Sequence, residues 1–234
     1  MNLPYIIVNR MQNREICSEG ITTFLNPHTY VVHRDNPELL SRFDHICFDG
    51  IMMVKALRMA GVKDAERISF DMTSLAPEVF HTASEKGLSV YFVGAKPGVI
   101  EKGVEKISAS YPELRIAGYR NGYFKDNERE ESFERIKDSG ADIVVCGMGA
   151  PLQEEYLADL KDSGWTGCGY TCGGFLHQTA EGIKYYPDWA DRYNLRWAYR
   201  IYDEPYLFKR YLTNYSRFAL HFLRDMKEFR RLCR

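Results

Sequence analysis

The sequence lacks the features of secreted, membrane-spanning and disulfide-rich proteins. Its N-terminal apolar run, residues 5–8, is too short for a signal peptide, and no small-residue cleavage site follows it. No apolar stretch approaches the roughly 20 residues that span a bilayer. The six cysteines are scattered, most of them in apolar contexts, which favours buried free thiols over disulfides or a zinc site. We therefore expect a cytoplasmic protein, either free or peripheral to a membrane.

Motifs for cofactors and metals are also scarce. Gly94–Gly98 resembles a loose phosphate-binding loop, but it lacks the G-x-G-x-x-G fingerprint and has no Walker lysine at the required place. No Asp-x-Asp pair of the kind that holds a divalent metal occurs in the sequence. The sequence therefore predicts neither a bound cofactor nor a metal, although Lys96 in this loop could contact a phosphate.

Charge is unevenly distributed along a chain of ordinary composition. The 234 residues are 45% hydrophobic and carry a net charge of −1, which predicts one globular domain of ordinary core size. From residue 192 onward, nine Arg and two Lys are set against four acids, a net charge of +7, whereas the preceding part carries −8. We therefore divide the chain into a core, residues 1–190, and a basic appendage, residues 191–234.

The appendage has the pattern of an amphipathic helix. Aromatic residues recur at steps of three or four from Phe208 to Phe229. The arginines on the neighbouring stripe lie seven apart: Arg210, Arg217, Arg224 and Arg231. Such a helix can lie on an anionic membrane, dock on a partner or cover the domain's own core. The aromatic stripe alone favours core packing, but the arginines favour the membrane. Nucleic acid is not predicted, since no binding motif is present and the rest of the chain is acidic.

Strand-like and helix-like segments alternate along the core. This alternation predicts a Rossmann-like α/β fold with a mainly parallel sheet flanked by helices. The predicted strands are residues 5–8, 21–25, 45–48, 89–93, 115–119, 142–146 and 167–171. The predicted helices are residues 51–60, 75–86, 99–110, 127–139 and 153–163. Because ligands bind beyond the carboxyl ends of strands in such sheets, the residues that follow each strand are the candidates for function.

Several strand ends carry candidate residues. Asp49 follows a predicted strand, where partial burial could tune it as a base; a helix N-cap is the competing interpretation. The glycines of Gly147–Gly149 let the backbone approach an anionic ligand, and Gln153 offers a donor and an acceptor to a sugar or base. A plain helix start explains this segment equally well. Arg67 is either a surface ion-pair partner of Glu66 or a diphosphate ligand.

The order of these motifs resembles the WecG/TagA/CpsF glycosyltransferases (glycosyltransferase family 26). The resemblance spans about Ile21 to about Arg210 and is strongest in Gly147-x-Gly149-x-Pro151-x-Gln153-Glu154, followed by Glu204-Pro205. The other motifs, in chain order, are Asn26-Pro27, Asp49-Gly50, Glu66-Arg67, Phe92–Gly98, Tyr111-Pro112, Gly122-Tyr123-Phe124 and Gly173-Gly174-Phe175. The family implies an inverting, metal-independent transferase that moves an N-acetylmannosamine-type or uronic acid sugar from UDP to a polyprenyl-diphosphate-linked acceptor. Such an enzyme works in bacterial cell-surface polysaccharide biosynthesis, on the cytosolic face of the plasma membrane.

The resemblance also implies a role for each matching residue. Asp49 would be the general base, Asn26 would position a sugar, and Arg67 would stabilise diphosphate. Binding of the nucleotide sugar is assigned to Gly94, Lys96, Gly147, Gly149, Gln153, Glu154 and Gly174. The basic tail would bring this site to the membrane, with its arginines at the lipid diphosphate: Arg210, Arg217 and Arg224.

Departures from the family pattern leave the donor sugar open. Phe24 stands where the family often has Thr, and residues 176–178 and 185–187 differ from the usual Asp and Arg-Ala-Pro. Two other classes of protein also remain: a nucleotide-dependent oxidoreductase that uses the Gly94 loop, and a non-enzymatic membrane adaptor that uses the tail. The sequence is compatible with a monomer and with a homo-oligomer.

Overall fold

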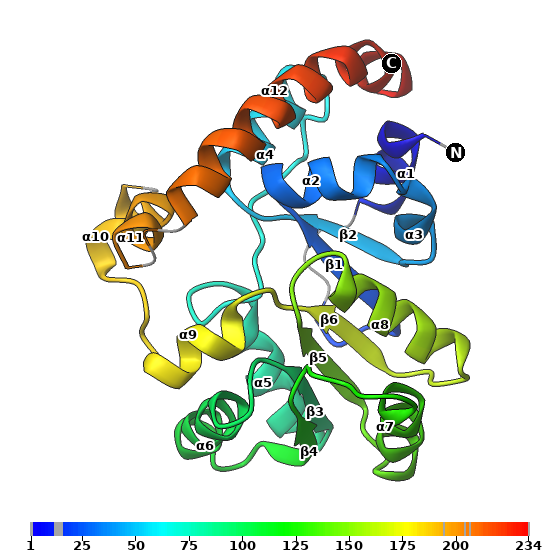
Figure 1. Cartoon of the computed structure of the whole chain (residues 1–234), viewed down its shortest axis with the longest axis vertical. Coiled ribbons are helices and arrows are strands. Elements are labelled where there is room, and N and C mark those ends of the chain that lie inside the picture. Colours follow the sequence, from blue (N-terminus) through cyan, green and yellow to red (C-terminus); the bar gives the residue numbers. More distant parts are fainter. Residues whose placement is uncertain (1, 12–15, 194, 204, 206, 234) are drawn as a thin grey trace.

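A twisted parallel sheet forms the centre of the molecule (Figure 1). The computed structural model describes residues 2–11, 16–193, 195–203, 205 and 207–233, without the side chains of residues 188, 191, 197, 207 and 209–211. Within this part, six strands pair in the order β2-β1-β6-β5-β3-β4, all parallel. The strands are β1 (Gly20–Leu25), β2 (His45–Phe48), β3 (Ser89–Gly94), β4 (Arg115–Arg120), β5 (Ile143–Gly147) and β6 (Cys168–Thr171). The predicted α/β fold class is confirmed.

Helices cover both faces of the sheet and its β2 end. The first helices are α1 (Leu3–Arg10), α2 (Pro27–Arg34), α3 (Pro37–Ser41), α4 (Ile51–Met59), α5 (Leu75–Lys86) and α6 (Val99–Ser110). They are followed by α7 (Glu128–Asp138), α8 (Leu152–Asp162), α9 (Phe175–Glu181), α10 (Asp188–Arg192), α11 (Arg196–Asp203) and α12 (Leu207–Leu232). One face packs on α5, α6 and α9, the other on α3, α7 and α8, while α1, α2, α4 and α12 form a third apolar cluster.

The apolar runs that predicted strands are buried on both faces, as in other parallel sheets. In β5, Ile143 and Val145 pack into the α5–α6–α9 cluster, whereas Val144 and Cys146 pack into the α7–α8 cluster. Successive side chains of a strand point to opposite faces, so only a continuous apolar run can fill both layers. This requirement explains why β5 has no polar alternation.

One predicted strand is wrong. Residues 5–8 belong to helix α1, which begins after Asn2, whose side chain accepts a hydrogen bond from the Tyr5 N–H at 3.1 Å. A four-residue apolar run fits a strand or one side of a short helix equally well, and here the Asn cap and Pro4 favour the helix. The other predicted strands and all predicted helices are present, whereas α2, α3, α9, α10 and α11 were not predicted.

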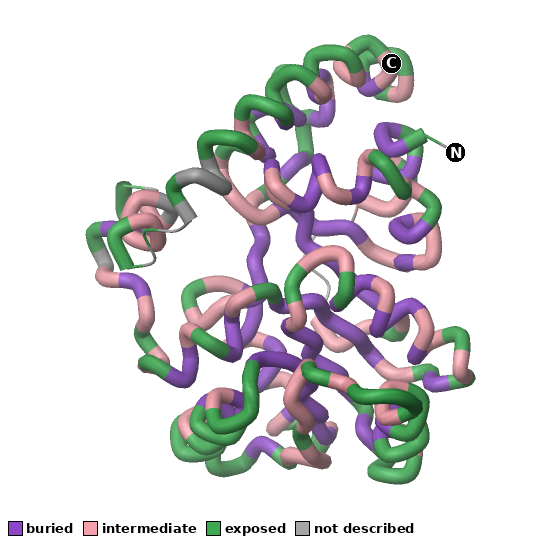
Figure 2. Tube along the Cα trace, in the orientation of Figure 1, coloured by how far each residue is buried: buried purple, intermediate pink, exposed green. Residues whose placement is uncertain are grey.

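The long C-terminal helix α12 covers part of the protein's own core. Its Phe218 and Phe222 lie against the buried Tyr30 of α2, with ring centroids 5.3 and 5.7 Å away. The Tyr30 hydroxyl donates to Asp225 Oδ2 at 2.7 Å, and the Arg34 guanidinium donates to both oxygens of the same carboxylate at 3.0 Å. Figure 2 shows exposed residues along the outer side of this helix. The aromatic stripe therefore packs on the domain from Phe218 to Phe229, and the opposite face remains accessible.

The packing of α12 predicts a stability effect. Replacing Phe222, which is 3% exposed, by Ala should lower the free energy of unfolding by about 3 to 5 kcal/mol, because it removes contacts with Tyr30, Phe218 and Phe229. The exposed neighbour Leu223 is the matched control, and Leu223→Ala should stay within about 0.5 kcal/mol of the unmodified protein. Urea denaturation followed by circular dichroism measures both values. Equal stability of the two variants would contradict this packing.

Candidate active site

A cavity of about 1120 Å³ lies at the carboxyl ends of the strands. Its walls come from the segments that follow all six strands, together with residues of α11 and α12. In open parallel sheets this edge is where ligands bind, because every strand delivers its following loop to the same side. Most of the predicted site residues line this cavity: Asn26, Asp49, Arg67, Lys96, Gly147, Gly149, Gln153 and Gly174.

Two predicted substrate-binding residues do not line it. A Cβ on Gly94 would lie 2.2 Å from the Gly147 carbonyl oxygen, so glycine is required there by the close approach of two strand ends. Glu154 is completely buried, with its carboxylate below the cavity wall. A direct substrate contact, as the sequence predicted for Glu154, does not fit this position.

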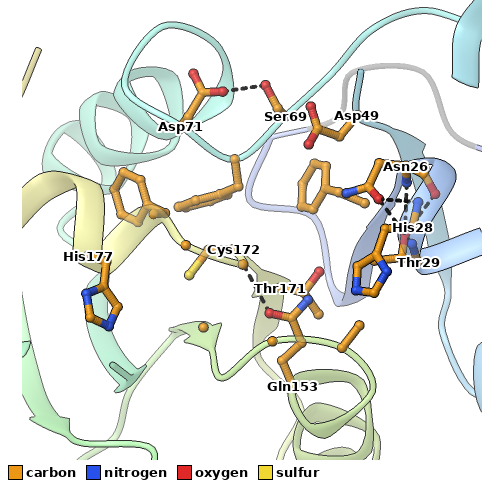
Figure 3. A pocket seen from close by; sticks show the side chains of 18 of the residues that line it. Asn26, His28, Thr29, Asp49, Ser69, Asp71, Gln153, Thr171, Cys172 and His177 are labelled. Atoms are coloured by element: carbon orange, nitrogen blue, oxygen red, sulfur yellow. Dashed lines mark hydrogen bonds between the residues drawn. The ribbon is translucent and has the colours of Figure 1, made fainter. Parts of the chain in front are cut away.

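Asp49 follows β2, and its side chain faces the cavity (Figure 3). Its backbone N–H donates to the Leu25 carbonyl at 2.8 Å, which fixes the turn between sheet and helix. The N-cap of α4 is Gly50, at a φ of +84° that glycine adopts without strain, so Asp49 does not cap this helix. The competing N-cap interpretation is therefore wrong, and the carboxylate remains available to the cavity.

The surroundings of Asp49 disfavour its charged form. Burial, and secondarily the charge of the nearby Asp71 carboxylate, raise the pKa of Asp49, while Arg67, Arg196 and Arg200 act in the opposite direction. A carboxylate with a raised pKa is a stronger proton acceptor than an exposed one, and the three arginines favour its charged form. This combination suits a general base.

Arginines from two parts of the chain meet at Asp71. Arg196 Nη1 donates to Asp71 Oδ2 at 2.7 Å, and the Ser69 hydroxyl donates to the same oxygen at 2.6 Å. Arg67 Nη2 donates to the Ser69 hydroxyl at 3.3 Å and lies 3.9 Å from Asp71 Oδ2. Arg67 thus lines the cavity beside Asp71 rather than pairing with Glu66 at the surface, and its role as a diphosphate ligand stays a prediction.

Sequence reasoning missed Arg196 and Arg200. Both line the cavity from α11, and a Cβ on Gly174 would lie 3.4 Å from the Arg200 guanidinium. Their four-residue spacing, which places them on one face of a helix, was the available signal. Nothing in the spacing indicated that this face of the helix would turn towards the strand ends. The cavity therefore has guanidinium groups from the core and from the appendage beside two carboxylates, Asp49 and Asp71.

Asn26 is both a helix cap and a cavity residue. Its Oδ1 accepts hydrogen bonds from the N–H groups of His28 and Thr29, each at 3.0 Å, and the Thr29 hydroxyl accepts the Asn26 N–H at 2.8 Å. This capping box fixes the start of α2 at the cavity. His28 Nδ1 also lies 2.8 Å from the Asn214 side-chain nitrogen of α12, which ties the appendage to the same wall.

Gln153 lines the cavity but its polar ends are used within the protein. Its Oε1 accepts the Gly173 N–H at 3.0 Å (Figure 3). Its Nε2 donates to Glu154 Oε1 at 2.9 Å. One Nε2 hydrogen and one lone pair of Oε1 are left for a ligand, so Gln153 keeps one donor site and one acceptor site, half of the capacity of its side chain.

Two of the three predicted lipid-binding arginines lie apart from this cavity. Arg217 and Arg224 are exposed on α12 and do not line it, while the side chain of Arg210 and all of Glu204 lie outside the described residues. No described helix combines the length and apolar character needed to cross a membrane. In the described part of the chain, no three His, Cys, Asp or Glu side chains gather as a metal site.

Comparison with known proteins gives consistent matches over nearly the whole chain. The model of the "Glycosyl transferase WecG/TagA/CpsF family" matches residues 3–232. A UDP-Gal:alpha-D-GlcNAc-diphosphoundecaprenol beta-1,4-galactosyltransferase of Shigella boydii is 33% identical over 227 residues, which cover 96% of this chain and 94% of that protein. An N-acetylglucosaminyldiphosphoundecaprenol N-acetyl-beta-D-mannosaminyltransferase of Bacillus subtilis (strain 168) is 31% identical over 238 residues, 97% of this chain and 91% of that protein.

Proposed function

Because the chain belongs to the WecG/TagA/CpsF family of glycosyltransferases, we propose that it moves an N-acetylmannosamine-type or uronic acid sugar from UDP to a sugar on polyprenyl diphosphate. The family resemblance inferred from the motifs is confirmed, and the enzyme is a glycosyltransferase. This membership sets aside the oxidoreductase and adaptor alternatives. The names of the two relatives support a lipid-diphosphate acceptor, while their different donors leave galactose as a competitor for the donor subsite.

The observation that carries the proposal is the Asp49 carboxylate, which faces a cavity that is also lined by guanidinium groups. Asp49 would take the proton of the acceptor hydroxyl as its oxygen attacks the anomeric carbon. The bond between that carbon and the UDP oxygen breaks on the opposite face, which inverts the configuration. Arg67, Arg196 and Arg200 would stabilise the charge that develops on the departing diphosphate. In this mechanism fixed guanidinium groups carry the role of a divalent metal.

A transfer assay tests the function. Purified protein is incubated with a panel of UDP-sugars, including N-acetylmannosamine, its uronic acid, galactose and N-acetylglucosamine, and a short-chain polyprenyl-diphosphate N-acetylglucosamine acceptor. Mass spectrometry detects the disaccharide product, and NMR of the new linkage gives its configuration. We expect an inverted linkage from an N-acetylmannosamine-type donor and equal rates with and without EDTA. No transfer from any UDP-sugar would contradict the proposed function, and a loss of rate in EDTA would contradict metal independence.

The charge of Asp71 predicts a shift in the pH profile. The base must be deprotonated, so kcat/KM falls as the pH drops through the pKa of Asp49, which lies above the ordinary range because of burial and Asp71. Asp71→Asn removes one cause of that rise and frees Arg196 from its ion pair, and both effects lower the pKa. The acidic limb should therefore move to lower pH, by up to about one unit. A limb that stays in place would exclude Asp49 as the titrating group.

The outer face of α12 supports a peripheral membrane role for the appendage, residues 191–234. Leu212, Leu220 and Leu223 are each more than half exposed, and Arg217 and Arg224 are exposed on the same helix. Apolar side chains flanked by arginines bind anionic membrane surfaces. Leu212 also lines the cavity, so a lipid surface at this face would lie beside the site. These features support our proposal that the enzyme works at the cytosolic face of the plasma membrane.

Charge reversal on α12 tests membrane docking. Arg217→Glu with Arg224→Glu should lower binding to phosphatidylglycerol vesicles at least tenfold, since each residue near the surface contributes about 1 kcal/mol. The matched control, Lys86→Glu with Lys102→Glu, makes the same change of charge on exposed residues of α5 and α6, at the other end of the molecule (Figure 1). Vesicle sedimentation measures all three proteins. An equal loss in both double variants would show a net-charge effect only.

A further inference from the structure

A buried polar network lies under the cavity, and the mechanism above makes no use of it. Its members are almost completely inaccessible to solvent: Thr23 and Glu154 are 0% exposed, His33 and Thr171 are 1% exposed, and Gln153 is 4% exposed. Polar side chains are rarely buried together unless they satisfy one another. Their placement below the ends of three neighbouring strands needs a physical explanation.

Glu154 is the centre of this network. Its Oε1 accepts two hydrogen bonds, from the Thr23 hydroxyl at 3.1 Å and from Gln153 Nε2 at 2.9 Å. The Thr171 hydroxyl donates to that of Thr23 at 3.1 Å, which extends the chain of hydrogen bonds from β1 to β6. Glu154 lies in the first turn of α8, where the helix dipole favours a carboxylate.

The other carboxylate oxygen faces a histidine. Glu154 Oε2 lies 3.7 Å from His33 Nε2, and neither atom has a hydrogen-bond partner among the described residues. His33 belongs to α2, whose first residues form the cavity wall around Asn26. Glu154 is thereby enclosed between a β1 threonine and an α2 histidine, and its carboxylate has a single orientation.

The network determines which way the Gln153 amide points. Because Nε2 donates to Glu154, the Oε1 atom faces the opposite direction and accepts the Gly173 N–H at 3.0 Å. An amide rotated by half a turn would set two acceptors against each other at Glu154 and two donors at Gly173. Gly173 and Gly174 form the turn after β6 that lines the cavity beside Arg200.

We propose that Glu154, held by Thr23 and His33, is a positioning residue that orients the Gln153 amide and thereby fixes the Gly173–Gly174 turn for binding of the UDP moiety. The identity of the ligand, UDP, rests on the proposed function, whereas the positioning of the turn by Glu154 does not depend on it. Glu154 acts through Gln153 and touches no substrate. The buried Glu154 carboxylate thus links β1, the start of α8 and the turn after β6.

Isothermal titration calorimetry with UDP tests the proposal. Glu154→Ala should raise the Kd for UDP about tenfold and raise the donor KM more than it lowers kcat, since the substitution releases the Gln153 amide. Gln153→Ala should have a similar effect, and the double variant should be no worse than Gln153→Ala alone. Glu154→Gln should restore the affinity to within about threefold, because its carbonyl replaces Oε1 and its amino group can donate to His33 Nε2.

Glu155→Ala is the matched control. Glu155 is the next residue in the same helical turn and does not line the cavity, so this variant should bind UDP normally. Ordinary UDP affinity in a folded Glu154→Ala protein, or a Glu154→Gln variant as weak as Glu154→Ala, would overturn the proposal. If Glu154→Ala does not fold, Thr23→Val replaces it, with an expected rise in Kd of about threefold; an unchanged Kd would overturn the proposal equally.

Amide hydrogen exchange separates this inference from the function on which it rests. In the protein without ligand, the Gly173 N–H should be protected, and Glu154→Ala should accelerate its exchange at least tenfold while Glu155→Ala leaves it unchanged. If the unmodified protein does not bind UDP, the proposed function fails, and the exchange of this amide still decides whether Glu154 positions the turn.

Discussion

Replacing Asp49 by Asn should lower the rate of sugar transfer about a thousandfold or more while the affinity for the UDP-sugar stays within a few-fold. An amide of the same shape can occupy the space, but it cannot accept the proton of the acceptor hydroxyl. A general base increases the rate by about 10² to 10⁴. Among the described residues, the other carboxylate that lines the cavity belongs to Asp71, and it already forms an ion pair with Arg196. Product formation under saturating donor measures kcat, and calorimetry measures binding.

The same substitution should make the protein more stable at neutral pH. The pKa of Asp49 is raised in the folded state, so folding disfavours its ionised form. Protonation favours the fold at low pH, and this contribution is lost as the pH rises above the normal range of aspartate. Asn carries no charge to bury, so the melting temperature should rise at pH 7 while activity is lost. A higher melting temperature together with lost activity would show that Asp49 is kept for function at the expense of stability.

Asp64→Asn is the matched control for both measurements. Asp64 is exposed, lies outside the cavity and should tolerate the change without effect on rate or melting temperature. Transfer by the Asp49→Asn protein at a rate within tenfold of the unmodified enzyme would exclude Asp49 as the base. A loss of both transfer and donor binding would instead indicate that Asp49 holds the substrate.

Removing the Arg200 guanidinium should have the second largest effect. Arg200→Ala should lower kcat about a hundredfold, the scale found when one preorganised donor to a developing negative charge is removed. The residue lines the cavity next to Gly174 and lies near enough to Asp49 to influence its pKa. Arg200→Lys should recover only part of the rate, because a single ammonium cannot make the paired hydrogen bonds of a guanidinium.

Because Arg200 belongs to the appendage, its assay must separate an effect on catalysis from an effect on membrane docking. A water-soluble short-chain acceptor makes the rate independent of vesicle binding. Arg230→Ala, an exposed arginine of α12, removes the same charge far from the cavity and should leave kcat unchanged in this assay. A normal kcat for Arg200→Ala would remove this residue from the mechanism, and an equal loss for Arg230→Ala would attribute the effect to net charge.

The positions of several site residues were predictable because of sheet geometry. Asp49 and Gly147 each follow an apolar run, and in a parallel sheet all such positions meet at one edge. The cavity does lie there, so the prediction needed only the strands and their direction. The apolar run of α1 shows the limit of this reasoning, since four residues do not distinguish a strand from one side of a helix.

The sequence by itself determined the strand pattern, the family and the residues at the strand ends, because these depend on local periodicity and on the order of short motifs. Only the tertiary structure decided that α12 packs on Tyr30, that Glu154 lies below the cavity wall, and that Arg196 and Arg200 reach Asp71 and Gly174. These outcomes depend on contacts between residues far apart in the chain. Composition and spacing describe each helix alone, whereas the face that a helix buries is determined by the surface on which it packs.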